Sequence, residues 1–328
     1  METPQERLNV LVHRFKELQD TLGLSDNRFA GRYKLYLGSA KSWSMLKSGD
    51  IAGYRNPSKL LVQLEKMAST VDGGSSIEKF IETPFARQMS ARLDLLRESK
   101  TDRRILACLA QTGCGKSAWA RHEEGESPDT MSYVRVLPTW RESLFGIARG
   151  MATSIGAPIR TSPRQQIEAI TEFLKGQPRL VINFDEAHDG GVLLMKLIKM
   201  WVDCTSVKFI YMAFPTEWDR VRSSGIGAVA EARQFCRRVM RPIFDEYRDG
   251  VGAGDVSAYL KASLDSTTDL KTVSEDMLPL IRKHENLSIL EDAIIEARNE
   301  SEATDAALTP ALVHQALRAL CKAEIHRN

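Results

Sequence analysis

The segment from residue 110 to residue 117 has the composition of a phosphate-binding loop. The residues that we expect to contact a bound nucleotide are Gly113, Cys114, Gly115, Lys116 and Ser117. The glycines allow a loop whose backbone N–H groups surround phosphate oxygens, the lysine adds a positive charge, and the serine hydroxyl can bind a magnesium ion. The chain departs from the pattern G-x-x-x-x-G-K-[ST] at its first position, where the small residue Ala110 replaces glycine.

Two adjacent carboxylates supply the second half of this chemistry. Asp185 and Glu186 directly follow the apolar run 180–184, which is typical of a buried parallel strand. In such a site Asp185 binds the hydrated magnesium ion together with Ser117, and Glu186 orients and deprotonates the attacking water. The ordinary alternative is a solvated acidic pair after a strand, but the glycine loop upstream favours the catalytic interpretation.

Both groups of residues require an α/β framework to position them. The apolar run 105–109 predicts a strand that leads into the loop, and a helix is expected to begin at its end. Ligands of open α/β sheets bind at the carboxyl edge of the strands, where we expect the loop and the two carboxylates to meet. Further strands are predicted at 131–138 and 207–213, and helices at 140–154, 165–174, 190–202 and 228–238.

Helical segments flank this framework. Residues 1–70 contain an apolar stripe at helical spacing, two short helices at 25–33 and 39–46, and a closing helix from Asn56. This is the order of a helix-turn-helix DNA-binding domain. We expect a linker at 71–85, where Gly-Gly-Ser-Ser occurs, a nucleotide-binding core at 86–250, and a separate helical subdomain at 251–328.

The N-terminal segment offers donors for a nucleic acid. The residues that we expect to contact phosphates or base edges are Ser39, Lys41, Ser42, Ser44, Lys47 and Arg55. Residues 1–70 carry 11 Lys and Arg against 7 Asp and Glu, a net charge of +4 that suits DNA. Trp43 is more typical of a core residue than of a base contact. The alternative for the whole segment is a helical protein-interaction domain that does not touch DNA.

Length, charge and cysteine content restrict the class of protein. A chain of 328 residues can form two or three domains, and its formal net charge of +2 gives no global nucleic-acid signature. The five cysteines show no metal-ligand spacing and are typical of reduced thiols in an intracellular protein. Neither a signal peptide nor an apolar run of membrane-spanning length is visible, so we expect a cytoplasmic protein without a membrane partner.

With these elements placed, the chain resembles AAA+ ATPases, and among them the DNA-transposition regulators of the phage Mu transposition protein B, TnsC and TniB type. The resemblance covers the loop 110–117, the strand before Asp185-Glu186, the strand that ends in the sequence 213–218, and the segment 234–238. The helix-turn-helix segment before the ATPase is similar to Mu protein B in domain order. The resemblance implies an AAA+ P-loop core with a parallel sheet, a C-terminal helical lid and an N-terminal helix-turn-helix domain.

The resemblance also implies two further catalytic residues. Thr216 would occupy the polar sensor position after a strand, although it could equally be the N-cap of the helix that follows. Arg238 matches the arginine that such ATPases extend into a neighbouring subunit's nucleotide site, where it stabilises charge on the transferred phosphoryl group. Arg237 is the competing candidate, and a solvated or phosphate-binding arginine is the ordinary alternative.

The expected lid departs from the family pattern. A Gly-Asn-Leu-Arg-like sequence often carries a sensor arginine in AAA+ lids, whereas this chain has Glu285-Asn-Leu-Ser288. A sensor arginine is therefore absent or supplied elsewhere, for example by Arg282. His188 completes the sequence Asp-Glu-Ala-His, which also occurs in helicases, but no companion helicase motifs are evident. We therefore expect His188 to lie at the surface or to support the catalytic residues from behind.

These features together predict an ATP-driven, DNA-binding switch. ATP and Mg²⁺ bound between subunits would favour a homo-oligomer on duplex DNA, as a ring or a helical filament, and hydrolysis would loosen it. Such an assembly would mark target DNA and recruit or activate a transposase. The alternatives are an ATP-switched transcriptional or defence regulator, whose N-terminal domain binds an operator or a protein, and a helicase loader.

Overall fold

The computed structural model describes most of the chain. The described residues are 4–21, 26, 29–30, 33–37, 40–49, 57–72, 80–223, 226–264, 270–284, 286–304 and 306–325. The chain forms two compact units, one containing residues 1–80 and 120–131 and the other containing residues 81–119 and 132–328.

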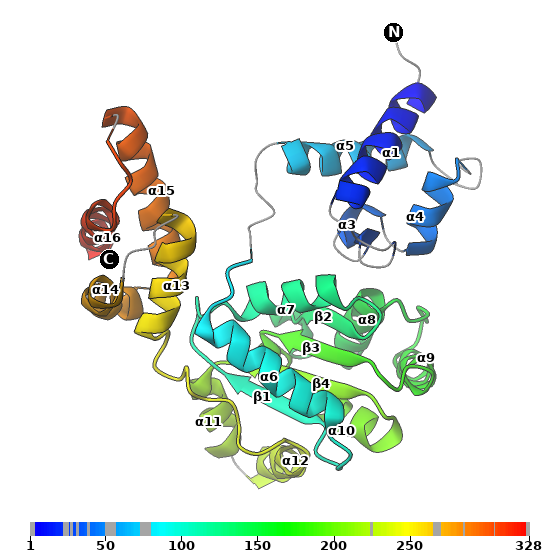
Figure 1. Ribbon diagram of the computed structural model, residues 1–328. Coiled ribbons are helices and arrows are strands. Elements are labelled where there is room, and N and C mark those ends of the chain that lie inside the picture. The colour runs from blue at the N-terminus through cyan, green and yellow to red at the C-terminus, as the bar shows by residue number, and fades with distance from the viewer. Residues whose placement is uncertain are drawn as a thin grey trace. The chain divides into compact units, whose positions relative to one another are not determined.

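The described part of the first eighty residues is mainly helical. Their described helices are α1 (Pro4–Thr21), α3 (Lys34–Leu37), α4 (Ala40–Lys47) and α5 (Pro57–Asp72) (Figure 1). The largest fully buried side chains of their core are Trp43, Phe15 and Phe29. The predicted closing helix is confirmed as α5, whereas the predicted helix at 25–33 lies mostly outside the described residues.

Helix α6 (Pro84–Glu98) begins inside the segment that was predicted as a linker. The Thr83 hydroxyl accepts a hydrogen bond from the backbone N–H of Ala86, and Pro84 occupies the first turn, so the sequence itself determines where the helix begins. At the other end of that segment α5 extends to Asp72, and residues 73–79 lie outside the described ranges.

A four-stranded sheet forms the centre of the nucleotide-binding core that we predicted. Its strands are β1 (Ile105–Leu109), β2 (Met131–Arg135), β3 (Val181–Asp185) and β4 (Lys208–Ala213), in the order β1-β4-β3-β2. Strands β1 and β3 both pair with β4 in parallel, and every residue of β1 and β3 is buried. Parallel strands buried on both faces are typical of α/β proteins. The predicted α/β class with a parallel sheet is therefore confirmed.

This strand order brings distant parts of the chain to one edge of the sheet. Strand β4 lies between β1, which leads into the loop 110–117, and β3, which ends at Asp185. The residues after parallel strands lie at the same edge, so the loop and the carboxylates are neighbours. On the other side of β1, residues 238–244 form only two parallel bridges, Ile105 with Val239 and Cys108 with Phe244, rather than a continuous last strand.

Helices cover both faces of the sheet. They are α6, α7 (Lys116–Glu126), α8 (Leu144–Ile155), α9 (Pro163–Lys175), α10 (Gly191–Cys204), α11 (Pro215–Ser223) and α12 (Ile226–Arg237). Alternate strand residues, among them Ala107, Phe184 and Phe209, form one apolar core with α8, α9, α10 and α12. Helix α6 packs beside β1 and crosses in front of the sheet in Figure 1.

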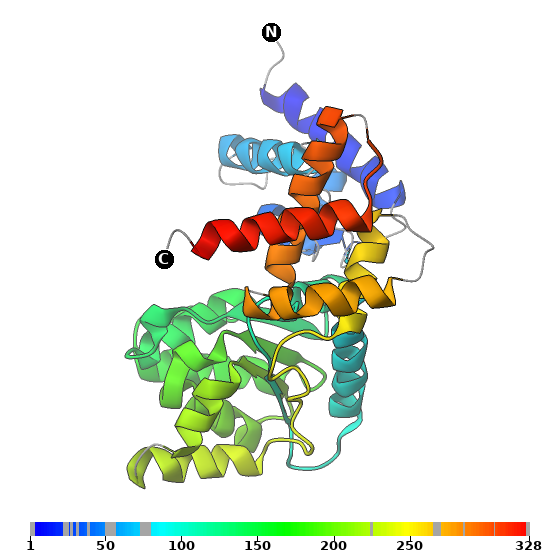
Figure 2. The ribbon, with the colours of Figure 1, turned by 90° about the vertical axis from the view of Figure 1, so that its left-hand side faces the viewer.

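The described part of the chain after residue 250 contains four helices. They are α13 (Ala253–Leu264), α14 (Lys271–Lys283), α15 (Leu287–Thr304) and α16 (Pro310–Ile325), and they pack against one another (Figure 2). Side chains such as Leu260, Met277, Leu290 and Leu317 are buried among them. The helical patterns predicted for 251–328 are confirmed in the described part of this segment.

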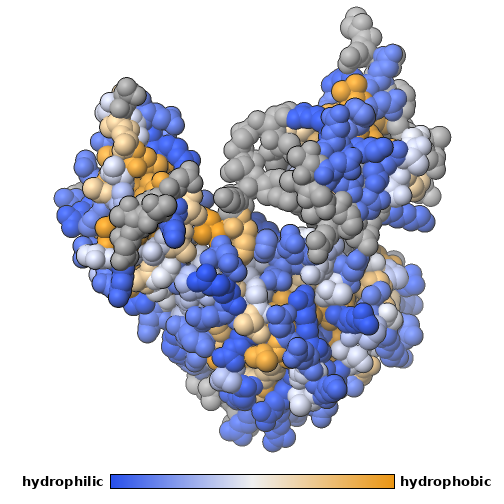
Figure 3. Space-filling model, in the orientation of Figure 1, coloured by the Kyte–Doolittle hydropathy of each residue, from blue (hydrophilic) through white to orange (hydrophobic). Residues whose placement is uncertain are grey.

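The surface drawn in Figure 3 is mainly hydrophilic, and its apolar residues occur in small patches. Within the described ranges, none of the helices has both the length and the apolar character that a membrane crossing requires.

Candidate functional site

The loop between β1 and α7 has the backbone that its glycines allow. Gly113 and Gly115 have φ angles of 70° and 91°, values that residues with a side chain rarely adopt. Ala110 needs no such freedom, because it continues β1: its N–H donates to the carbonyl of Ala213 in β4. The departure from the glycine pattern at this position therefore introduces no backbone strain. Cys114 is fully buried, and burial raises the pKa of its thiol to about 11.

Lys116 lies within this loop at the first position of α7. Its side chain is only 5% exposed, and its Nζ donates to the carbonyl oxygens of Ala110 and Gln111 at 2.9 and 2.7 Å. The ring of Phe214, which follows β4, lies 5.2 Å from the same nitrogen. The ammonium group is thus held at the loop, where phosphate oxygens could take the place of the two carbonyl acceptors.

Ser117 and Asp185 are in direct contact, although 68 positions separate them in sequence. The Ser117 hydroxyl donates to Asp185 Oδ2 at 2.5 Å, and the Tyr133 hydroxyl of β2 donates to the same oxygen at 2.8 Å. Asp185 is only 1% exposed. A hydroxyl and a carboxylate are oxygen ligands of the kind that magnesium prefers, and a bound ion would take the place of the hydrogen bond between them.

The rest of a magnesium shell would have to come from outside the protein. The part of the chain that the structure describes contains no group of three or more His, Cys, Asp or Glu side chains that could hold a metal. Magnesium in proteins commonly uses one or two protein oxygens and completes its octahedron with water and substrate phosphates. Ser117 and Asp185 therefore suit a metal that arrives with a nucleotide.

Glu186 follows Asp185 with an unusual backbone. Its φ is 53°, in the left-handed region, and its side chain is about half-buried. Burial, and next the charge of Asp185, raise the pKa of the Glu186 carboxyl above its ordinary value. The ring of His188 lies beside it, with Nδ1 at 3.5 Å from Glu186 Oε2, and also contacts the ring of Phe214. A carboxylate that holds a proton more tightly than usual is suited to act as a general base.

Thr216 lies in the segment that follows β4, and its sensor role stays a prediction. Helix α11 begins at Pro215, so Thr216 belongs to its first turn and is not the N-cap. Its side chain is exposed. Phe214 is the residue of this segment that contacts both Lys116 and His188, and nothing in the local sequence pattern indicated it.

Arg238 lies at the opposite end of β1 from the glycine loop. Its carbonyl accepts the N–H of Ile105, the first residue of β1, whereas the loop follows Leu109. Five strand residues separate the two ends by about 16 Å, so Arg238 cannot reach the nucleotide site of its own chain without a large rearrangement. Its guanidinium donates to both carboxylate oxygens of Asp203 in α10, at 2.5 and 2.8 Å, while Arg237 beside it is exposed.

The predicted DNA-contacting residues divide into three groups. Lys41 and Ser44 are exposed on one face of α4. Ser42 is half-buried, and Lys47 is ion-paired with Asp26, whose pKa is lowered by a hydrogen bond from Gln19 and by that lysine. Ser39 and Arg55 lie outside the described residues.

Trp43, on the inner side of α4, is a core residue. It has no exposed surface, and its indole N–H donates to Gln19 Oε1 at 2.7 Å. The same glutamine donates to Asp26, so a chain of hydrogen bonds fixes which face of α4 points outward.

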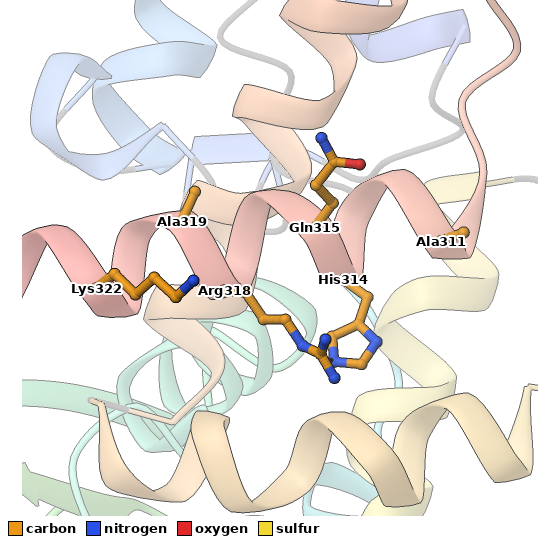
Figure 4. A pocket seen from close by; sticks show the side chains of 6 residues that line it. All are labelled: Ala311, His314, Gln315, Arg318, Ala319 and Lys322. Atoms are coloured by element: carbon orange, nitrogen blue, oxygen red, sulfur yellow. Dashed lines mark hydrogen bonds between the residues drawn. The ribbon is translucent and has the colours of Figure 1, made fainter.

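A hollow on the surface of α16 shares no residue with the loop site. It is lined by Ala311, His314, Gln315, Arg318, Ala319 and Lys322 (Figure 4). The Arg318 side chain donates to His314 Nε2 at 3.2 Å, and burial together with the charge of that arginine lowers the pKa of the histidine. The hollow therefore carries positive charge but none of the catalytic groups.

No protein-family model matches the chain, and no curated protein matches it significantly. The functional assignment must therefore come from the chemistry of the loop, the two carboxylates and the exposed face of α4.

Proposed function

We propose that this protein is a magnesium-dependent ATPase of the AAA+ type, which assembles on duplex DNA and regulates transposition by selecting target sites and recruiting or activating a transposase. The observation that carries the proposal is the 2.5 Å contact between Ser117 and Asp185 beside a glycine loop at the carboxyl edge of a parallel sheet. Two oxygen ligands next to a phosphate-binding loop are what a magnesium nucleotide requires.

The roles of the site residues follow from their positions. The N–H groups of Gly113, Cys114 and Gly115 bind phosphate oxygens, and Lys116 leaves its carbonyl acceptors to bind the outer phosphates. Ser117 and Asp185 hold magnesium, which neutralises charge that develops on the phosphates. Tyr133 keeps the Asp185 carboxylate oriented through its hydroxyl.

Glu186 is the residue that activates water in this proposal. It is adjacent to the magnesium ligand Asp185, and its raised pKa makes it a stronger base than an ordinary surface glutamate. Its left-handed backbone turns the chain directly after β3. Backbone strain of this kind is common where a side chain must be aimed at a reaction centre.

An intersubunit site is supported by the location of Arg238. Because this residue lies at the end of β1 far from its own loop, its contribution to hydrolysis requires a neighbouring subunit. An arginine provided in this way would stabilise charge on the transferred phosphoryl group and would link hydrolysis to assembly. The exposed face of α4, with Lys41 and Ser44, would contact DNA. The role in transposition rests on the resemblance in motifs and domain order described above.

Electron microscopy of the protein with duplex DNA tests this function. With a non-hydrolysable ATP analogue and magnesium we expect rings or helical filaments on the DNA, and with ADP we expect them to disperse. The variant Lys116→Ala is the control, because it keeps the DNA-binding helices and loses the phosphate contact. Particles that remain monomeric with both ligands would contradict assembly on DNA and would favour an ATP-switched regulator that binds an operator or a protein.

A further inference from the structure

The outer side of the glycine loop is hydrogen-bonded to the beginning of α15. Asn286 Nδ2 donates to the carbonyl of Thr112 at 2.8 Å, and the backbone N–H of Leu287 donates to the carbonyl of Gly113 at 3.1 Å. These carbonyls belong to the peptide units that contain the N–H groups of Gly113 and Cys114. Because a trans peptide is planar, its C=O and N–H point in opposite directions. A donor that fixes the carbonyl therefore aims the N–H at the other side of the loop.

Asn286 is itself held tightly. Its side chain is 5% exposed, its Oδ1 accepts the N–H of Val251 at 3.1 Å, and its own N–H donates to the carbonyl of Ile281 at 2.9 Å. Its φ is 57°, a left-handed value that asparagine tolerates better than most residues with a side chain. Residue 250 is a glycine, and a Cβ at this position would lie 2.3 Å from Asn286 Oδ1. Any larger residue at position 250 would therefore displace the Asn286 side chain.

The Leu287 N–H has no acceptor within its own helix. Leu287 is the first residue of α15, and the first N–H groups of a helix lack intrahelical partners. The Gly113 carbonyl accepts a hydrogen bond from the Leu287 N–H. Gln111, at the start of the loop, is held by the segment that precedes α13, because its N–H and its side-chain amide donate to the carbonyls of Tyr247 and Arg248.

We propose that Asn286 is a positioning residue for the phosphate-binding loop. Its amide and the Leu287 N–H hold two peptide units in the orientation in which their N–H groups receive phosphate oxygens. Hydrogen bonds on a peptide carbonyl also polarise the N–H of the same unit. Phosphate binding and attachment of α15 to the loop are therefore coupled, and each strengthens the other. The phosphate part of this inference rests on the proposed nucleotide site, whereas the contact itself does not.

Two replacements of Asn286 separate its contacts. Asn286→Asp keeps an oxygen for the Val251 N–H and tolerance of a positive φ, but loses the donor to Thr112. Asn286→Gly removes both contacts without adding a charge near the phosphates. Asn299→Asp is the matched control, since Asn299 is exposed on α15, the helix that follows Asn286.

The first measurement is backbone amide hydrogen exchange without nucleotide, followed by nuclear magnetic resonance. In both Asn286 variants we expect the Leu287 N–H to exchange on the order of tenfold faster, because its acceptor in the loop is no longer held. The Val251 N–H should stay protected in Asn286→Asp and lose protection in Asn286→Gly. The strands β1 and β3 should exchange as in the parent protein and in Asn299→Asp.

The second measurement is the affinity for ATP with magnesium, by calorimetry. Both Asn286 variants should bind ATP on the order of tenfold more weakly, with melting temperatures near that of the parent. Parental exchange at Leu287 or parental ATP affinity would overturn the proposal, and so would faster exchange throughout β1 and β3. If Leu287 exchange changes as expected but the parent protein binds no ATP, the proposed function fails while the attachment of the loop to α15 stands.

Discussion

At the scale of single residues, the site contains two neighbouring carboxyl groups, those of Asp185 and Glu186, which lie in different surroundings. Asp185 is buried and accepts hydrogen bonds from Ser117 and Tyr133. Glu186 is half-buried beside the charge of Asp185. Its burial and this neighbouring charge both disfavour the ionised form of the Glu186 carboxyl. The negative charge of Glu186 is therefore a cost to the folded protein, and this cost depends on pH.

Replacement of Glu186 by glutamine should make the folded protein more stable at neutral pH. Folding raises the pKa of this carboxyl above its value in the unfolded chain, so the charged form destabilises the fold above the raised pKa. This penalty shrinks as the pH falls and vanishes below the pKa of the unfolded chain, about 4.3. We expect the melting temperature of Glu186→Gln to exceed that of the parent by about 2 °C at pH 7, and by less at pH 5.

Thermal unfolding at several pH values measures this difference. Glu142→Gln serves as the control, because Glu142 is exposed and should give equal melting temperatures at every pH. A gain for Glu186→Gln that does not change with pH, or a loss at pH 7, would show that burial of the charge is not the cause.

The site could be predicted from sequence only where residue types and spacing determine it. The glycine loop and the strand ending in Asp185 have local patterns, and the contact between Ser117 and Asp185 follows once both strands belong to one parallel sheet. Tyr133 and Phe214 have no such pattern. They reach the site because β2 lies next to β3 and because β4 ends beside the loop, and strand order of this kind is a tertiary property.

At the scale of elements, β1 separates the glycine loop from Arg238. The loop lies at its carboxyl end, and Arg238 is bound beside its amino end, where it is paired with Asp203. Both partners of this pair are partly exposed, so the pair contributes little to stability, less than about 1 kcal/mol. Removal of the arginine should therefore leave the fold intact, which allows its role in hydrolysis to be tested cleanly.

Arg238→Ala should lower the rate of ATP hydrolysis by the assembled protein on the order of 100-fold or more, because charge on the transferred phosphoryl group loses a stabilising partner. Binding of ATP by the monomer should not change, since this arginine lies far from the loop of its own chain. Arg237→Ala is the matched control, because Arg237 is the adjacent arginine and the competing candidate. Steady-state hydrolysis with duplex DNA compares the variants, and a loss confined to Arg237→Ala would assign the role to that residue.

Helix α4 gives a prediction for DNA binding. Removing the exposed side chains of Lys41 and Ser44 together should weaken binding to duplex DNA about tenfold and lower the salt dependence by about one phosphate contact. Lys16→Ala, an equal change of charge on the exposed side of α1, should alter the affinity less than twofold. Fluorescence anisotropy at several salt concentrations provides the comparison. Equal losses in both variants would indicate unspecific attraction to this helical segment.

The boundaries of elements show which local signals were decisive. A helix was predicted at 140–154, whereas α8 begins at Leu144 after a short 3-10 turn. The hydroxyl of Ser143 accepts the N–H of Gly146 at 2.9 Å and fixes that start, a capping signal that the apolar spacing alone did not show. Residues 238–244 follow an extended pattern, yet they bond to β1 only at separate points, because pairing depends on the path of the chain rather than on residue type.

At the scale of the whole molecule, the chain combines a glycine loop beside two carboxylates, an arginine at the far end of β1, and a segment, residues 1–70, with a net charge of +4 from 11 basic and 7 acidic side chains. The described C-terminal helices are attached to the loop through Asn286 and Leu287. The roles proposed for these parts in an ATP-driven switch depend on nucleotide binding at the loop. Nucleotide binding is therefore the claim on which the proposed function rests.

Calorimetric titration of the protein with ATP and magnesium tests this claim most directly. We predict that the parent binds about one ATP per chain and that Lys116→Ala, with a melting curve like that of the parent, binds at least about 100-fold more weakly, because the buried ammonium is lost. The absence of ATP binding by the parent, or equal affinities in the two proteins, would contradict the assignment of residues 110–117 as a phosphate-binding loop.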